Sequence, residues 1–203
     1  MNQADIKELY FITHIDNIKS ILQHGILCYN KAKKILCKSI ADSEIQKRRD
    51  KVVIPGGKLK LHDYANLYFN PRNAMMFKRK DMHQELVILR IDSAILNEPE
   101  IVISDGNASG DYVRFFSSPQ ELESLDGELI YADDWRNEDI FQYWRRKSAV
   151  CAEVLVPDSV KPEFIEGAYV SCQDTYQKLI RLLQGSSFAD KVSIKPKLFF
   201  QGV

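Results

Sequence analysis

The sequence lacks the features of a membrane protein or of a general polyanion binder. Its 203 residues contain no apolar run of about 18 residues, the length that could span a bilayer. Residues 1–9 lack the basic and then apolar order of a signal peptide. With 28 basic and 28 acidic residues the formal net charge is zero, so any affinity for nucleic acid must come from local clusters. We therefore expect a soluble, cytoplasmic protein with no membrane partner.

Common metal-site and hydrolase motifs are missing as well. The sequence has no Gly-x-Ser-x-Gly and no glycine-rich phosphate loop, which disfavours a serine hydrolase and a Rossmann fold. No Cys-x-x-Cys pair occurs, which argues against a structural zinc site and a disulfide framework. We expect no metal, and we expect most of the cysteines to be small core residues. They are Cys28, Cys37, Cys151 and Cys172.

The composition that is present is typical of a globular protein. Hydrophobic residues make up 45% of the chain and charged residues 28%, and the length suffices for one well-buried core. We predict a single domain over residues 1–203. Strand-like and helix-like stretches interleave without a βαβ rhythm, which favours an α+β fold with a mixed, split sheet and flanking helices.

Apolar patterning places the expected elements along the chain. A helix is predicted to follow Asn70-Pro71, with Asn70 as its N-cap, and Pro55-Gly56-Gly57 predicts a loop. Residues 112–150 are rich in aromatic and charged side chains and are expected to form a long connection. The expected strands are 9–13, 67–69, 85–91, 101–103, 152–156, 168–171 and 198–200, and the other helices 15–22, 44–51 and 175–183.

Four polar features are candidates for chemistry. One is Tyr68 in a predicted strand with Asn70 at the strand's end, for which the alternative is core packing with a helix cap. Glu153 stands inside the β-favouring run 151–156, where burying a carboxylate is costly unless partners satisfy it. The alternative is a glutamate on an edge strand that faces water. His14 directly follows a predicted strand, and Arg48 and Arg49 lie in a basic helix. Their alternatives are a structural histidine and a solvated helix face, and residue types alone leave these choices open.

The order of several longer motifs narrows the choice. Together they resemble the DarT family, bacterial toxins that ADP-ribosylate bases of single-stranded DNA, and the resemblance covers about residues 10–170. The family is similar to the wider ADP-ribosyltransferases, whose split sheet places NAD across a cleft. The motifs are YFITHIDNI (10–18), HGIL (24–27), LHDY (61–64), YFNPRNAM (68–75), DGNAS (105–109) and AEVLV (152–156).

The resemblance implies a role for each matching residue. Glu153 is expected to be the catalytic glutamate, assisted by Arg49 rather than Arg48. Tyr68 is the expected aromatic wall for nicotinamide, with Tyr64 as the alternative. NAD is the expected co-substrate, and the residues expected to bind it are Thr13, His14, Asn17, Gly25, Arg49 and Tyr68.

The resemblance also implies partners. A single DNA strand is bound by basic grooves with aromatic platforms, and the segment 112–147 has that mixture. A monomer and a cognate antitoxin with macrodomain-type ADP-ribosyl hydrolase activity are expected. The modified base is weakly expected to be guanine, with thymine open. The alternative for this segment is that its aromatics are core and its cations solvated. The basic run 78–80 is a second possible phosphate-contacting patch, for which a solvated surface is favoured. The expected DNA contacts are Tyr112, Arg114, Trp144, Arg145 and Arg146.

Overall fold

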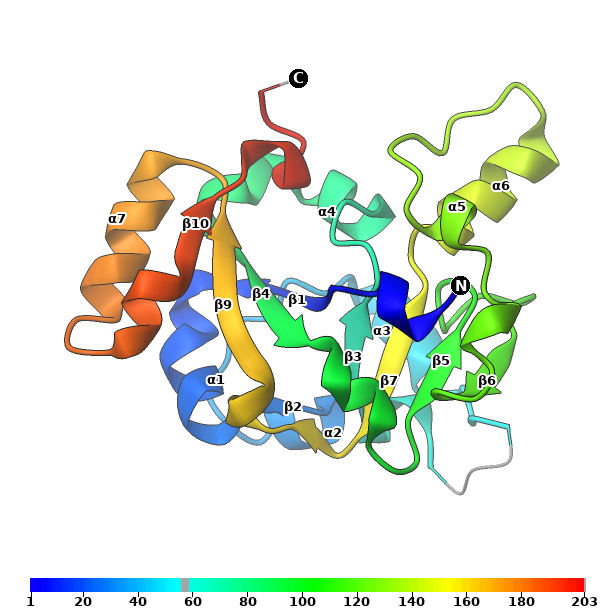
Figure 1. Ribbon diagram of the computed structural model, residues 1–203, viewed down its shortest axis with the longest axis horizontal. Coiled ribbons are helices and arrows are strands. Elements are labelled where there is room, and N and C mark those ends of the chain that lie inside the picture. Colours follow the sequence, from blue (N-terminus) through cyan, green and yellow to red (C-terminus); the bar gives the residue numbers. More distant parts are fainter. Residues whose placement is uncertain (56–58, 203) are drawn as a thin grey trace.

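An eight-stranded sheet organises the chain (Figure 1). The computed structural model describes residues 1–55 and 59–202. The strand order is β10-β9-β4-β1-β3-β7-β5-β6, and a two-stranded sheet joins β2 to β8. The strands are β1 (Glu8–His14), β2 (Ile26–Leu27), β3 (Tyr64–Tyr68), β4 (Leu86–Asp92), β5 (Val102–Ser104), β6 (Phe115–Ser117), β7 (Glu153–Pro157), β8 (Ser159–Val160), β9 (Ile165–Val170) and β10 (Val192–Ile194).

The sheet is split at its centre. Strand β1 pairs with β4 along seven residues, 8–14 against 86–92, but it meets β3 only where Tyr10 lies opposite Tyr68. Strand β3 pairs in turn with β7 along its whole length. Neighbouring strands are antiparallel except β9 and β10, which are parallel. The predicted α+β class with a split, mixed sheet is therefore confirmed.

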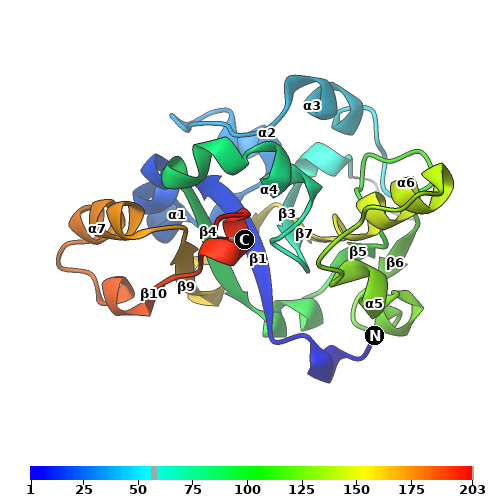
Figure 2. The same ribbon diagram turned by 90° about the horizontal axis from the view of Figure 1, so that it is seen from above.

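Short helices cover both faces of the sheet (Figures 1 and 2). The buried hydrophobic side chains form a larger cluster on one face of the sheet and a smaller cluster on the other. Residues of α1 and α7 belong to the larger cluster, and Met76 of α4 belongs to the smaller one. Helices α6 and α7 lie at opposite ends of the molecule (Figures 1 and 2). The helices are α1 (Ile18–His24), α2 (Tyr29–Ala32), α3 (Ser43–Arg49), α4 (Ala74–Lys78), α5 (Gly127–Ile130), α6 (Ile140–Ala149) and α7 (Gln173–Leu182).

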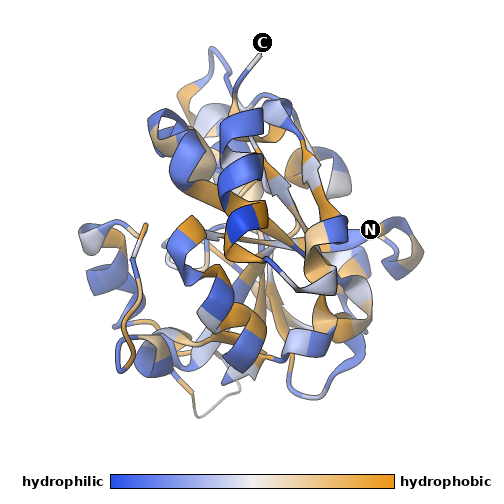
Figure 3. Cartoon of the chain, turned by 90° about the vertical axis from the view of Figure 1, so that its left-hand side faces the viewer, coloured by the Kyte–Doolittle hydropathy of each residue, from blue (hydrophilic) through white to orange (hydrophobic). Residues whose placement is uncertain are grey.

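Side chains alternate between the two faces along each strand. Leu9, Leu67 and Val154 belong to the larger core cluster. The opposite face carries Tyr10 and Tyr68, and we call it the site face. From the side, the helices show hydrophilic residues outward and hydrophobic residues toward the sheet (Figure 3). Within residues 1–55 and 59–202, no helix combines the length and apolar character that crossing a bilayer requires.

Two predicted elements are wrong. Asn70 caps no helix: its Oδ1 accepts a hydrogen bond from the backbone N–H of Arg72, its Nδ2 binds the carbonyl of Ile130, and α4 starts later with Asn73 as its N-cap. Residues 198–200 form no strand. A 3-10 helix spans Pro196–Phe199, and β10 is the last strand. Pro196 cannot donate to a strand ladder, and the buried ring of Phe199 fits a turn.

The other predicted elements agree with the structure to within a few residues, with the strand at 168–171 lying earlier, as β9. The segment 112–150 holds β6, α5 and α6, which the patterning did not predict as regular elements. In the loop prediction at Pro55-Gly56-Gly57, Pro55 lies in a turn and both glycines lie outside the described residues. The cysteine prediction holds for Cys28 and Cys151, which are buried, whereas Cys37 is exposed.

Candidate active site

Glu153 begins β7 in the interior of the sheet, between β3 and β5, and only 1% of it is exposed. The alternative of a water-facing glutamate on an edge strand is therefore excluded. The Oε1 atom accepts a hydrogen bond from the backbone N–H of Ala108 at 2.9 Å. The backbone N–H of Glu153 donates to Ser104 Oγ at 3.1 Å. The loop after β5 therefore fixes the carboxylate at the start of its strand.

Arg49 provides the countercharge to this carboxylate. Its Nη1 lies 3.0 Å from Glu153 Oε1 and its Nη2 2.9 Å from Oε2, a bidentate pair of two buried side chains. Burial alone would lower the pKa of Arg49, but the charge and hydrogen bonds of Glu153 offset this and raise the pKa above its usual value. Arg48, one residue earlier on α3, is exposed. Of the arginine doublet, the fold brings only Arg49 to Glu153.

A row of side chains leads across the site face from Glu153. Tyr68 is its cross-strand partner on β3, and Tyr10 on β1 is the partner of Tyr68. Partners in adjacent strands share a face, so the three side chains stand side by side. Burial, and then the negative charge of Glu153, raise the pKa of the Tyr68 hydroxyl well above its usual range. Tyr68 thus stays a neutral aromatic next to the carboxylate.

A cavity of about 1140 Å³ opens beside this row. Its walls come from β1, the turn after α1, the segment from α2 to α3, strand β3 and the start of α4. The size exceeds that of a drug-sized ligand pocket and suits an extended dinucleotide. Of the predicted NAD-binding residues, the lining includes Thr13, Asn17, Gly25, Arg49 and Tyr68.

Two of these residues also shape the cavity wall. The Nδ2 of Asn17 donates to Thr13 Oγ1 and to the carbonyl of Lys38, and its Oδ1 accepts from the N–H of Lys38. This holds the loop before α3 against β1. Gly25 has a φ of +81°, and a Cβ there would lie 2.2 Å from the carbonyl oxygen of Val160. Only glycine fits this close approach to β8.

His14 ends β1, as predicted, and its ring has two partners within the protein. Its ring is buried, Nδ1 accepts a hydrogen bond from the N–H of Asp16, and Nε2 lies 2.9 Å from the carboxylate of Glu85. It is not among the residues that line the cavity. Both ring nitrogens of His14 therefore have partners, and the residue directly follows Thr13, which lines the cavity.

Several cavity residues were missed by the sequence analysis. His62 stacks on Tyr29 with ring centroids 4.1 Å apart, and its Nε2 lies 3.0 Å from Gln46 Oε1. Burial, opposed by Asp50, lowers the pKa of His62. The only sequence signal for His62 was the LHDY motif, which also contains Tyr64, the alternative aromatic wall. The resemblance implied no role for the histidine. Tyr64 also lines the cavity.

The predicted DNA-binding residues are not among those that line the cavity, and three of them, Trp144, Arg145 and Arg146, lie on α6. The side chain of Trp144 is largely exposed and lies under Lys147, whose Nζ is 4.9 Å from the ring centroid. Lys147 also lines the cavity, so it connects the two regions. Tyr112 is 97% exposed, and Arg114 pairs with Asp105 at 2.7 Å. Arg145 is exposed, and Arg146 Nε is buried without a hydrogen-bond partner among the described residues.

Two residues of the basic run 78–80 make contacts within the protein. Lys78 pairs with Asp42, and Arg79 Nε donates to the carbonyl of Ile40. Both contacts tie α4 to the segment before α3. Over residues 1–55 and 59–202, no group of three or more His, Cys, Asp or Glu side chains is arranged to hold a metal ion. The chemistry that the geometry offers is that of a buried carboxylate, a guanidinium and a neutral aromatic beside a large cavity.

Known proteins are related to this chain in sequence. The family model of DarT, described as ssDNA thymidine ADP-ribosyltransferase, matches residues 10–200. A DNA ADP-ribosyl transferase of Thermus aquaticus is 33% identical over 168 residues, 78% of this chain and 72% of that protein. A DNA ADP-ribosyl transferase-DNA ADP-ribosyl glycohydrolase fusion protein of Thermosipho africanus is 30% identical over 203 residues. The match covers 96% of this chain and 50% of the fusion protein, so the chain spans half the length of that relative.

Solved structures agree with the sequence comparisons. Thermus sp. 2.9 DarT in complex with ADP-ribosylated ssDNA superposes with a TM-score of 0.83 at 25% identity and covers 98% of both chains. The same protein in complex with carba-NAD+ gives a TM-score of 0.76 at 25% identity, covering 96% of this chain and 98% of the other.

Proposed function

Because this chain belongs to the DarT family of NAD-dependent DNA ADP-ribosyltransferases, we propose that it transfers ADP-ribose from NAD to a base of single-stranded DNA. The observation that carries the proposal is the buried Glu153–Arg49 pair beside a cavity of about 1140 Å³. A carboxylate and a guanidinium next to an aromatic wall are the groups that this transfer needs. The relatives named as DNA ADP-ribosyl transferases support it.

Glu153 is the proposed catalytic residue. When the bond between ribose C1′ and the nicotinamide nitrogen breaks, its electron pair leaves with nicotinamide and positive charge develops on the ribose. A carboxylate bound to the adjacent 2′-hydroxyl stabilises that charge. The base nitrogen then bonds to C1′ and loses its proton, which Glu153 can accept. Such general-base assistance typically contributes ~10²–10⁴-fold.

Arg49 has two proposed tasks. In the structure it holds the Glu153 carboxylate in place with both of its terminal nitrogens. Its planar fork also matches the oxygens of a diphosphate, so it can bind NAD when the dinucleotide enters the cavity. The proposed NAD contacts of Thr13, Asn17, Gly25 and Tyr68 follow from their places on the cavity wall. His14, at the end of β1 next to Thr13, is also proposed to bind NAD, at a ribose hydroxyl.

The DNA strand is proposed to reach the site past α6. Trp144 and Lys147 form an exposed aromatic and basic surface next to the cavity mouth. Arg145 and Arg146 follow on the same helix, and stacked bases on aromatic side chains bind at ~1–3 kcal/mol each. Tyr112 and Arg114 are proposed as a second part of this path, although Arg114 must leave Asp105 to contact a phosphate.

The modified base and the partner belong to the same proposal. The motif resemblance weakly favours guanine, whereas the description of the matched family names thymidine. The fusion of transferase and glycohydrolase in the Thermosipho protein supports a toxin with an antitoxin that removes the modification. We propose that this chain acts as a monomer with such a hydrolase as its cognate antitoxin.

The test is mass spectrometry of oligonucleotides after incubation with NAD. Four oligonucleotides, each enriched in one base, are expected to show that one of them gains an ADP-ribose, which also identifies the base. Glu153→Gln is expected to abolish the gain, while circular dichroism shows an intact fold. Labelling of RNA or protein alone would overturn the DNA substrate and keep the enzyme class. Full labelling by Glu153→Gln would overturn the catalytic role.

A further inference from the structure

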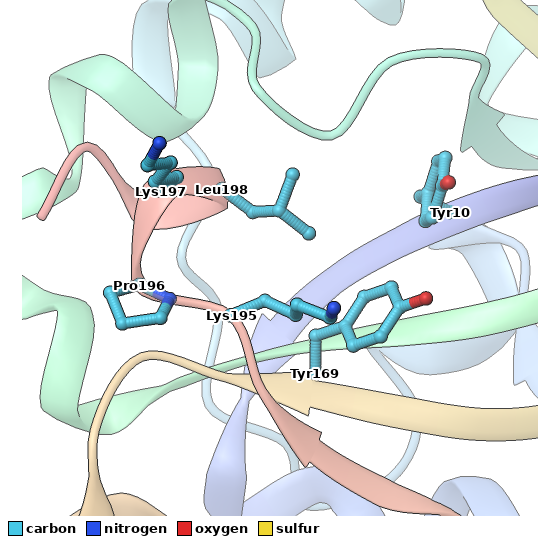
Figure 4. A pocket seen from close by; sticks show the side chains of 6 residues that line it. All are labelled: Tyr10, Tyr169, Lys195, Pro196, Lys197 and Leu198. Atoms are coloured by element: carbon cyan, nitrogen blue, oxygen red, sulfur yellow. The ribbon is translucent and has the colours of Figure 1, made fainter.

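A second cavity lies on the site face, beyond Tyr10 (Figure 4). Its volume is about 470 Å³, within the range of small-ligand pockets. Two tyrosines from the sheet and the segment 195–198 after β10 line it, and the side chains of Tyr10, Tyr169 and Leu198 border the space in Figure 4. None of its residues lines the larger cavity. The function proposed above gives this cavity no task.

The second cavity continues the row that starts at Glu153. Tyr10 is the cross-strand partner of Tyr68, which is the partner of Glu153. With strands spaced ~4.8 Å apart, Tyr10 lies roughly 10 Å from Glu153 along the row. Neighbouring nucleotides of one strand can span such a distance. A strand whose target base sits at Glu153 can therefore place an adjacent base over Tyr10.

The charges around the cavity favour a polyanion. Lys195 and Lys197 are exposed at its rim. The acidic residue nearest to the tyrosines is Glu8, which accepts hydrogen bonds from Arg90 at 2.6 and 2.8 Å and from the Tyr169 hydroxyl at 3.3 Å. Arg90 thus neutralises Glu8, and within residues 1–55 and 59–202 neither lysine forms an ion pair with an acidic side chain. Aromatic rings beside free cations are the combination that binds a nucleotide of a single strand.

The segment that carries the lysines is held in place by three contacts. Arg72 Nε donates to the carbonyl of Lys197, and the Arg72 guanidinium lies 4.2 Å from the centroid of the Phe200 ring. Gln201 Nε2 donates to the carbonyl of Lys80. The rim is therefore preorganised, which lowers the entropic cost of binding a ligand.

We propose that this cavity binds a nucleotide next to the modified one, its base against Tyr10 and Tyr169 and its phosphate at Lys195 and Lys197. The proposal rests on the proposed function, because it takes single-stranded DNA as the substrate of the Glu153 site. It gives the enzyme a second contact with the strand, on the side of Tyr68 away from α6. That contact makes longer oligonucleotides better substrates than short ones.

The first test is direct binding of a fluorescent single-stranded oligonucleotide, measured by anisotropy without NAD. Lys195→Ala/Lys197→Ala changes two exposed side chains and should leave the fold intact. The affinity is expected to fall, and the slope of log K against log salt to shrink by about 0.7 for each lost phosphate contact. The matched control is Lys19→Ala/Lys178→Ala, which removes two exposed lysines from α1 and α7, on the other face of the sheet. An equal loss in both variants would overturn the site.

The second test uses labelling kinetics on a long and a short oligonucleotide with the same target base. Tyr169→Leu is expected to raise KM for the long one about 5-fold to 100-fold and to leave the short one and kcat unchanged. Tyr169→Phe, which keeps the ring, should behave as the wild type. Unchanged KM in Tyr169→Leu, or equal losses on both lengths, would refute the cavity's role. Absence of labelling by the wild type would instead refute the proposed function, while the binding test still decides the site.

Discussion

Two regions of the molecule handle their charged groups in opposite ways. At Glu153 the carboxylate and the guanidinium of Arg49 are buried and paired, with the Ala108 N–H completing the arrangement. On α6 the aromatic and basic side chains face solvent, and Trp144 is 56% exposed. In the first region the polar groups have their hydrogen-bond partners within the protein, whereas in the second the Trp144 ring contacts Lys147 and Tyr143 and stays half-exposed. The difference separates a preorganised buried pair, the proposed site of chemistry, from an exposed surface that is proposed to bind DNA.

The strongest way to break this contrast is to remove one member of the buried pair. Arg49→Ala leaves Glu153 as an uncompensated buried carboxylate, so we expect a loss of about 3–5 kcal/mol in the free energy of unfolding together with loss of labelling. Arg48→Ala, the neighbouring control, should change stability by less than about 0.5 kcal/mol, because Arg48 is exposed. Urea unfolding and oligonucleotide labelling measure both effects. Comparable losses in the two variants would contradict the assignment of Arg49.

A milder change tests the exposed region. Trp144→Ala should raise KM for oligonucleotides about 5-fold to 100-fold, since a stacked base contributes ~1–3 kcal/mol, and should leave the melting temperature unchanged. Ile140→Ala is the matched control, because Ile140 lies on the same helix and is also 56% exposed. If Trp144→Ala lowers stability and leaves KM unchanged, the tryptophan packs the protein and does not bind DNA.

The smallest expected effect concerns His62, on the cavity wall near Arg49. Burial lowers its pKa below the unfolded value near 6.5. The folded state then binds fewer protons than the unfolded state. The contribution of His62 to the free energy of unfolding is therefore fully present above the unfolded pKa, and it is lost as the pH falls from the unfolded pKa toward the folded pKa. Wild type should therefore lose more melting temperature between pH 7.5 and pH 5 than His62→Gln, measured by thermal unfolding. Equal losses would show that other groups control the acid sensitivity.

Much of the architecture could be predicted because local patterns fix it. The apolar run of β4 forms a strand buried on both faces, and a glycine after α1 has the positive φ that the helix end requires. Helix α6 escaped prediction because its large apolar residues, Ile140, Phe141 and Trp144, are exposed and form no buried stripe. Asn70 resembled a cap, but its side chain is used by Ile130, a residue far along the chain.

The sequence by itself determined the family, the α+β class and the candidate residues Glu153 and Tyr68, since these depend on residue types in order. Only the tertiary structure decided between Arg48 and Arg49, because the rotation of α3 against the sheet selects which side chain reaches Glu153. It also turned the His14 ring toward Glu85 and aligned Tyr10 with Tyr68. Such choices depend on contacts between residues distant in the chain, and no local pattern encodes them.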